Sequence, residues 1–188
     1  MKPIAALLIW AACSGLFLFG HGGHAEDHFT TGLLHPFSGW DHLAACALVG
    51  LLAGRLKNIW PAPLMFAGGL AAGLALTLLL PGLPLTGALV VLSLLILFSL
   101  PALDVRDLST WLSCCLVMIG AAHGYGHAAA TGPQPGFLLG MFCTSLLLIG
   151  AFAAMIKAAK HAGRSLRFQY IATAAGVLFL QVTLYAWS

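Results

Sequence analysis

Residues 35–54 read HPFSGWDHLAACALVGLLAG, and this stretch decides the class of fold. Its second half is a continuous apolar run, yet the ionisable pair Asp41 and His42 lies at the start of that run. A charged side chain at the centre of a bilayer costs about 2.5–3.5 kcal/mol on insertion scales, so an intramembrane acid usually faces a partner or water. Pro36 and Gly39 are expected to bend or open the outer end of the helix, which would free backbone carbonyls beside the pair. The stretch therefore predicts a membrane helix in which the pair Asp41 and His42 has a role that outweighs the cost of placing it in the membrane.

The chain as a whole has the composition of an integral membrane protein. Its 188 residues are 61% hydrophobic and only 7% charged, with a mean hydropathy of +0.99. A soluble domain is about one-quarter charged. The cysteines are odd in number and all lie in apolar stretches, which argues against an extracellular disulfide framework. We expect one all-α membrane domain, with the lipid bilayer as its main partner and no nucleic-acid partner.

Six hydrophobic segments follow one another along the chain. Each is close to the ~20 residues that a helix needs to cross ~30 Å of hydrocarbon. They cover residues 33–54, 61–80, 83–103, 108–130, 135–155 and 168–187. They are continuously apolar and not alternating, which excludes a transmembrane barrel. The sequence predicts a six-transmembrane-helix bundle.

The N-terminal segment has the pattern of a secretory signal peptide. Lys2 is followed by an apolar run from Ile4 to Phe19. Cleavage after Gly20 or after Ala25 fits the small residues there, so we expect a signal peptide over residues 1–25 and the transmembrane domain over residues 26–188. An uncleaved anchor is the alternative.

The positive charges predict the orientation of the bundle. If the start of the chain is cytoplasmic and six helices follow, every Lys and Arg falls on the cytoplasmic side, as the positive-inside rule requires. These residues are Lys2, Arg55, Lys57, Arg106, Lys157, Lys160, Arg164 and Arg167. We therefore expect a bacterial inner-membrane protein whose mature N-terminus and C-terminus are both periplasmic.

The first group of candidate ligands lies in the outer third of the membrane. Asp41 precedes Arg55 by fourteen residues, about 21 Å at 1.5 Å per residue. On a continuous helix, His35, His42 and Cys46 share a face. The alternative is a packing role, in which Asp41 is hydrogen-bonded to a histidine only to lock the helices together.

A second group lies in AAHGYGHAAA, residues 121–130. His123 and His127 are four residues apart, a spacing that lets two imidazoles on one helix face bind the same divalent ion. Counted from Arg106, they lie about 25 and 31 Å across the membrane. Both groups therefore face the periplasmic half, and together they outline one polar site.

A third cluster lies just outside the predicted membrane. His21, His24 and His28 stand beside Glu26 and Asp27, and they could collect metal from the periplasm. Cleavage at the later site would remove the first two histidines. Imidazole with one carboxylate suits Ni, Co, Zn, Cu or Fe and is a poor match for Ca or Mg. Because binding requires neutral imidazoles, affinity should fall below about pH 6.5.

The stretch HPFSGWDHLAACALVGLLA, residues 35–53, resembles the HPxxGxDHxxxMxxVGxxA signature of the HupE/UreJ family of membrane proteins. The arrangement of the whole chain also resembles that of the family. It has a signal peptide, a histidine-rich start of the mature chain, six helices and a second histidine motif in the fourth helix. Members are associated with hydrogenase and urease systems and are regarded as nickel, sometimes cobalt, permeases. The resemblance implies that the residues which handle the metal are His35, Asp41, His42, His123 and His127.

Several positions depart from the family pattern. The second motif of the family resembles HGHAHGAE, whereas here Tyr125 replaces the middle histidine and Ala130 the acid. Leu148 stands where a fifth-helix histidine is common, and Cys46 stands where the signature usually has Met. The site thus has fewer metal ligands than the family pattern provides. This points to weaker affinity for the metal ion, a different metal preference or a loss of transport.

We predict a permease for a divalent transition metal, nickel first and cobalt second, that is not an enzyme. Ni²⁺ or Co²⁺ would be the transported ion, no cofactor would be permanently bound, and a hydrogenase or urease maturation system would be the partner. The chain lacks a G-x-x-x-x-G-K-[ST] phosphate loop and an H-E-x-x-H motif. One alternative is a metal-binding accessory protein that does not transport. A less favoured one is a haem protein with His42 and His123 as axial ligands.

Overall fold

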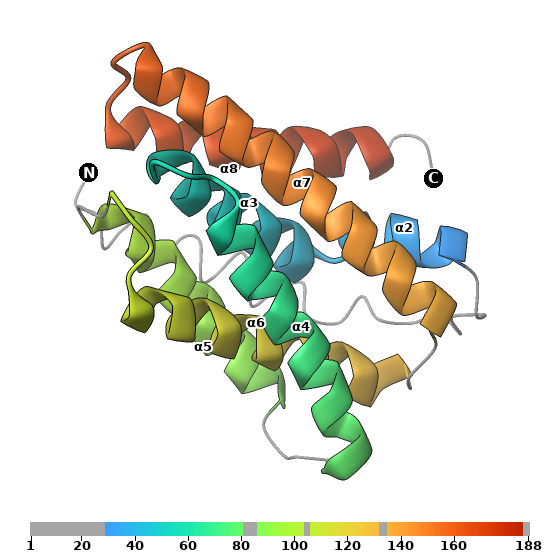
Figure 1. Ribbon diagram of the computed structural model, residues 1–188. Coiled ribbons are helices and arrows are strands. Elements are labelled where there is room, and N and C mark those ends of the chain that lie inside the picture. The colour runs from blue at the N-terminus through green and yellow to red at the C-terminus, as the bar shows by residue number, and fades with distance from the viewer. Residues whose placement is uncertain (1–28, 81–85, 104–105, 132–134, 186–188) are drawn as a thin grey trace.

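The computed structural model describes residues 29–80, 86–103, 106–131 and 135–185, and within these ranges it contains helices and no β-strand (Figure 1). The elements are α2 (Phe29–Ser38), α3 (Trp40–Arg55), α4 (Pro61–Leu79), α5 (Thr86–Ser99), the 3₁₀ turn η1 (Leu100–Ala102), α6 (Thr110–Thr131), α7 (Pro135–His161) and α8 (Leu166–Tyr185). The expected all-α class is confirmed. The predicted signal peptide, residues 1–25, lies outside the described ranges.

The first hydrophobic segment, residues 33–54, is divided into two helices, at the place where Pro36 and Gly39 were expected to bend it. Helix α2 ends at Ser38, Gly39 is extended with φ −109° and ψ 123°, and α3 begins at Trp40. The two helices are bent by 75° relative to each other. Pro36 contributes to the break because it has no N–H to donate within α2.

Two other helix ends differ from the expectation. The helix α5 stops early, because the chain tightens into η1 around Pro101. Conversely, α7 runs to His161 and ends in a Schellman motif. Gly163, with φ 68°, donates its N–H to Lys160, and Arg164 donates to Ala159, both at 3.0 Å.

Among the residues that the structure describes, two helices are apolar and long enough to cross a membrane, namely Pro61–Leu79 and Pro135–His161. The bent pair Phe29–Phe37 and Trp40–Arg55 makes a third span if its halves are counted together. Shorter apolar helices cover Gly87–Ala102 and Leu166–Val182. The finding supports a multi-pass membrane protein, whereas the count of six spans stays a prediction.

Helices α4 and α6 pack closely through glycines on both sides. A Cβ atom added at Gly69, Gly73, Gly120 or Gly124 would overlap a backbone carbonyl of the facing helix. The carbonyls concerned belong to Val117, Ala121, Phe66 and Leu70, respectively. Such close approach is how helices associate in lipid, where no hydrophobic force drives them together. Gly69 and Gly73, like Gly120 and Gly124, form a G-xxx-G pair, a spacing of small residues that is typical of closely packed membrane helices.

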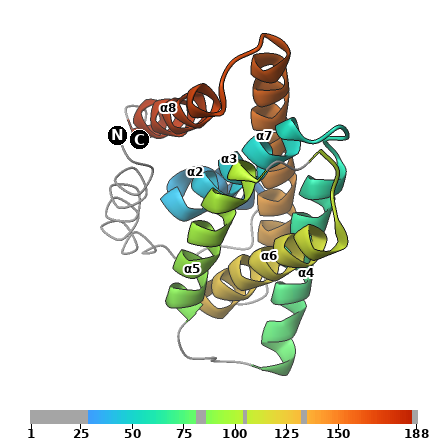
Figure 2. The same ribbon diagram turned by 90° about the vertical axis from the view of Figure 1, so that its left-hand side faces the viewer.

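Helix α3 is the centre of the molecule, since every residue from His42 to Gly54 is buried. It packs along α7, where Gly50 allows the approach of Ile149. Helix α2 also packs on α7, so that one helix from the second half of the chain supports both parts of the broken first helix. Figure 2 shows α4, α5 and α7 roughly aligned, with α8 set across one end.

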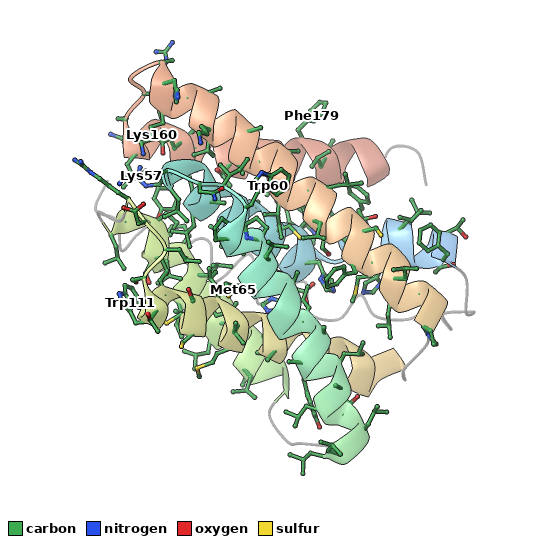
Figure 3. The ribbon with its side chains drawn as sticks, in the orientation of Figure 1. Lys57, Trp60, Met65, Trp111, Lys160 and Phe179 are labelled. Atoms are coloured by element: carbon green, nitrogen blue, oxygen red, sulfur yellow. The ribbon has the colours of Figure 1, made fainter. Side chains whose placement is uncertain are left out.

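The basic loops meet at one end of the bundle. The backbone N–H of Lys57 donates to the Arg106 carbonyl at 2.9 Å, which joins the α3–α4 and α5–α6 loops. From α7, Lys157 donates to the carbonyl of Lys57 at 3.0 Å, and Lys160 donates to that of Arg55 at 2.5 Å. Figure 3 shows Lys57 and Lys160 at this same end. The clustering agrees with the threading of the chain that the positive charges predict.

Candidate metal centre

Three of the predicted ligands lie in a row of aromatic rings that crosses the bundle. His35 of α2 and His42 of α3 have ring centres 5.0 Å apart, and those of His42 and His123 of α6 are 6.4 Å apart. The row is closed by Phe137 of α7, 4.9 Å from His35, and by Phe66 of α4, 5.9 Å from His123. We call these five residues the ring row. Two histidine motifs about 80 residues apart in sequence are thereby brought together, as the matching depths predict.

The break at Gly39 changes how His35 reaches the site. On a continuous helix His35 would lie two turns above His42, whereas here it is carried on α2 and meets His42 edge to face. Phe137 packs on its other side. The shared face of His35, His42 and Cys46 was expected only for a continuous helix, and the bend at Gly39 takes His35 out of that arrangement. The two helices bring His35 and His42 into contact through the bend.

His123 is fully buried, and its environment fixes its tautomer. Its Nδ1 lies 2.9 Å from the Ile119 carbonyl oxygen, which can only accept, so Nδ1 carries the proton. Ser93 Oγ, itself donating to the Val90 carbonyl, lies 3.3 Å from the same nitrogen. The lone pair is therefore on Nε2, which is buried and has no hydrogen-bond partner among the described residues. A metal-binding histidine usually has this arrangement, with one nitrogen donating to a carbonyl and the other available to the ion.

Asp41 lies in the first turn of α3 and is partly buried. It is close enough to His123 and Cys46 for its charge to act on both. A Cβ on Gly39 would come within 2.7 Å of the Asp41 Oδ1, so a glycine at the break leaves room for the carboxylate. Asp41 thus places a carboxyl group in the first turn of the helix that carries His42.

Cys46 lies one helical turn below His42 and is buried. It is hydrogen-bonded to Ser145 of α7, whose Oγ also donates to the Met141 carbonyl at 2.8 Å. Sequence reasoning missed both Ser145 and Ser93. Their only signal was a hydroxyl within an apolar run, alone at Ser93 and next to Thr144 at Ser145, and such hydroxyls usually bond to their own helix backbone.

The departures from the family pattern have structural roles. Tyr125 is buried and donates its hydroxyl to the Leu80 carbonyl at 2.6 Å, which ties α6 to the end of α4. Leu148 is buried in the apolar core. Helix α6 continues through His127, as its i, i+4 pairing with His123 requires, but the side chains of His127 and Ala130 lie outside the described part of the structure.

The spacing of the rings indicates what the site can hold. Two imidazoles that bind one ion through nitrogens at about 2.0–2.1 Å have ring centres about 5 Å apart at a tetrahedral angle and about 6.4 Å apart on opposite sides of the ion. The separation of His35 and His42 fits the first arrangement, and that of His42 and His123 fits only the second. Among the described side chains, no three His, Cys, Asp or Glu residues are grouped to hold one ion. A three-ligand site would require a ring to turn.

The remaining predicted ligands are not placed in the site. The N-terminal histidines His21, His24 and His28 precede the first described residue. His161, in the last turn of α7, is exposed among basic residues and belongs to the solvated end of the bundle.

The chain was compared with known proteins. A family model described as HupE / UreJ protein matches residues 8–184, a range that includes the ring row. Protein HupE of Rhizobium leguminosarum bv. viciae is 34% identical over 140 residues, which cover 69% of this chain and 73% of that protein. No solved structure matches the chain.

Proposed function

The chain belongs to the HupE/UreJ family, and from this premise we propose that it is a multi-pass membrane permease for a divalent transition metal. The family is associated with hydrogenase and urease systems and with the handling of nickel and cobalt. We assign nickel as the first substrate and cobalt as the second. The imported metal would supply the maturation of such an enzyme.

The observation that carries this proposal is the buried Nε2 of His123. An apolar bundle gains nothing from an imidazole nitrogen that lacks a partner, because burying a polar group without a hydrogen bond costs about 1–3 kcal/mol by protein mutational data. The Ile119 carbonyl orients the ring so that this nitrogen keeps its lone pair. A transiently bound cation would satisfy it.

The ring row would provide successive binding positions. An ion from the periplasm would first exchange hydration water for His35 and His42, whose spacing fits a shared ion. His123 would join once a ring turned, and the charge of Asp41 would offset that of the cation. Cys46, one turn further along α3, would offer a soft sulfur ligand on the inward side.

The orientation follows from the basic end of the bundle. Placing the loops around Lys57, Arg106 and Lys160 in the cytoplasm puts the ring row toward the periplasm, in agreement with the positive-inside rule. The protein would then lie in the bacterial inner membrane with both mature termini periplasmic.

The test is nickel and cobalt accumulation in a bacterial host deficient in nickel uptake, at submicromolar metal. The wild type is compared with the Asp41→Ala, His42→Ala double variant and with His123→Ala, at matched abundance in the membrane. His161→Ala is the control, because it removes an exposed histidine away from the ring row. We expect uptake by the wild type and the control and loss in the other two variants.

Equal accumulation by the wild type and the double variant would refute a permease that uses this site. Metal binding by the purified protein, without uptake into liposomes, would instead establish the accessory role that does not include transport. The ratio of nickel to cobalt accumulated by the wild type names the preferred substrate.

A further inference from the structure

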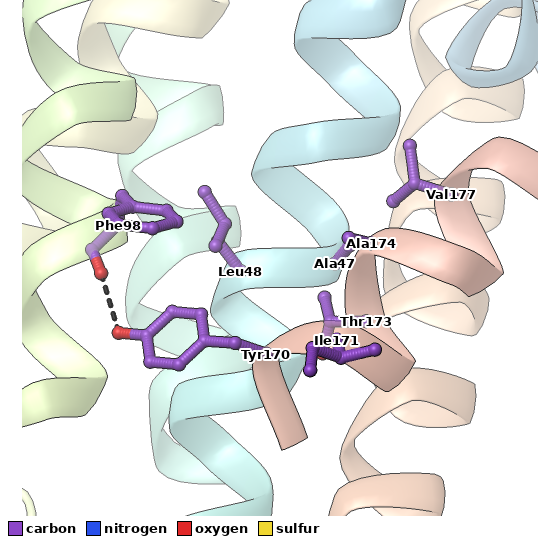
Figure 4. Close-up of a pocket in the computed structure, with 8 residues that line it drawn as sticks. All are labelled: Ala47, Leu48, Phe98, Tyr170, Ile171, Thr173, Ala174 and Val177. Atoms are coloured by element: carbon purple, nitrogen blue, oxygen red, sulfur yellow. Dashed lines mark hydrogen bonds between the residues drawn. The ribbon is translucent and has the colours of Figure 1, made fainter. Parts of the chain in front are cut away.

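An apolar groove lies between α3, α5 and α8, apart from the ring row. Figure 4 shows its lining, which includes Leu48 of α3, Phe98 of α5 and Tyr170, Ala174 and Val177 of α8. Its volume is about 170 Å³. The Tyr170 hydroxyl is used within the protein, since it donates to the Phe98 carbonyl at 2.7 Å. The surface left to an occupant is therefore hydrocarbon.

The groove opens outward and lies near the basic end of the bundle. Ile171, on its rim, is 57% exposed. Leu48 precedes Arg55 by seven residues, about 10 Å along α3. At that depth the groove faces the upper acyl region of the leaflet on the basic side.

Positive charges gather at the start of α8 (Leu166–Tyr185), the helix that lines one side of the groove. Arg167 lies on the same face of α8 as Ile171 and Ala174, four and seven residues later, and it is exposed. Arg164 lies over the Phe168 ring, 5.3 Å from its centre. The N-terminus of α8 itself adds a partial positive charge at this point.

Arg55 adds a third cation that no described carboxylate neutralises. It donates to the neutral Gln169 at 3.0 Å, its charge acts on Tyr170, and its Nε has no hydrogen-bond partner among the described residues. The acids in the described ranges are Asp107, which is paired with Lys57, and Asp41, which lies at the other end of α3. The groove thus combines a hydrocarbon interior with a cationic rim that no carboxylate of the described residues neutralises.

We propose that the groove holds one acyl chain of an anionic phospholipid, whose phosphate is bound by Arg167 and Arg164 at the start of α8. A zwitterionic lipid fits the interior equally well but gains less at the rim, because its headgroup carries no net charge. The site would anchor α8, which is set across the bundle, to its place against α3. This inference is independent of the metal proposal, since the groove shares no residue with the ring row.

The test is retention of lipid by the full-length protein in mild detergent, measured by native mass spectrometry. The protein is titrated with phosphatidylglycerol or with phosphatidylcholine of identical acyl chains. Arg167→Gln removes the rim charge, and Ala174→Phe fills the groove from an exposed position. Arg106→Gln is the matched control, because it removes an exposed arginine from the α5–α6 loop at the same end.

We expect the wild type to retain phosphatidylglycerol in preference to phosphatidylcholine. Arg167→Gln should lower retention of phosphatidylglycerol about fivefold, the effect of one basic residue at an anionic surface, and lower retention of phosphatidylcholine by a smaller factor. Ala174→Phe should lower retention of both lipids. The control should behave as the wild type does.

Three results would overturn the proposal. The first is equal retention of the two lipids by the wild type. The second is an equal loss in Arg106→Gln and Arg167→Gln, which would indicate a general attraction to surface charge. The third is full retention by a groove-filling variant that elutes as a monodisperse protein, with Ala174→Leu used if the phenylalanine variant aggregates.

Discussion

Two adjacent glycines of α4 provide a direct test of how this bundle is held together. A Cβ at Gly69 would overlap the Val117 carbonyl of α6, whereas a Cβ at Gly68 would meet nothing within 4 Å. The substitutions Gly69→Ala and Gly68→Ala add the same methyl group to the same helix, one residue apart. Only Gly69→Ala should lower the stability of the protein.

The magnitudes follow from the two environments. To accommodate alanine at position 69, α4 and α6 must separate by about 1 Å, because ordinary carbon contacts begin near 3.5 Å. Overpacking of this kind costs about 1–3 kcal/mol. Alanine at position 68 has no such cost and adds up to about 1 kcal/mol of helix propensity.

The assay is the apparent midpoint of thermal unfolding in one detergent at a fixed scan rate. With about 2–4 °C per kcal/mol for a chain of this size, Gly69→Ala should lower the midpoint by about 2–12 °C, and Gly68→Ala should leave it unchanged or raise it by a few degrees. Equal midpoints for the two variants would refute the close approach of α4 and α6. A larger loss at position 68 would contradict the packing direction of α4.

Three further predictions concern the site and its surroundings. Tyr125→Phe removes the hydroxyl that donates to the Leu80 carbonyl, so it should lower the free energy of unfolding by about 0.5–1.5 kcal/mol in thermal or denaturant unfolding. Metal uptake by this variant should persist, and its loss would instead assign the tyrosine to metal handling. Gly39→Ala should lower metal uptake with little loss of stability, because its Cβ displaces the Asp41 carboxylate while its φ of −109° suits alanine; unchanged uptake would argue against a role for that carboxylate position. Uptake measured from pH 7.5 to 5.5 should fall as the external pH drops below about 6.5, because protonated imidazole cannot bind a cation, and a rate that rises on acidification would contradict imidazole ligation.

The sequence was sufficient for the helical class and for the clustering of the basic loops. Continuous apolar runs of this length cross a membrane as helices, because a helix satisfies its own backbone hydrogen bonds. The positive-inside rule placed Lys57, Arg106 and Lys160 on the cytoplasmic side from the sequence alone. The G-xxx-G pairs indicated close packing. They could not indicate that Gly69 and Gly73 face Gly120 and Gly124, because the pattern identifies a contact surface and not its partner.

The candidate site was predictable in its residues and not in its geometry. The similar depths estimated for His42 and His123 along their helices correctly suggested that the two residues approach each other. The direction of the 75° bend at Gly39, which brings His35 edge to face with His42, depends on packing against α7 and leaves no local signal. The tautomer of His123 depends on a side-chain rotamer that reaches the Ile119 carbonyl, and helical periodicity does not specify rotamers.

The support that α7 gives to both halves of the broken first helix has a consequence for biosynthesis. His35 and His42 leave the ribosome early, yet Phe137, which fixes the ring of His35, and Gly140, which allows α2 to approach, are translated about a hundred residues later, a delay of about 5–20 s at ordinary elongation rates. The nascent chain therefore presents its first histidines to the translocation machinery before their final neighbours exist. The ring row forms only after the start of α7 has been inserted, so no intermediate that lacks α7 carries the assembled site.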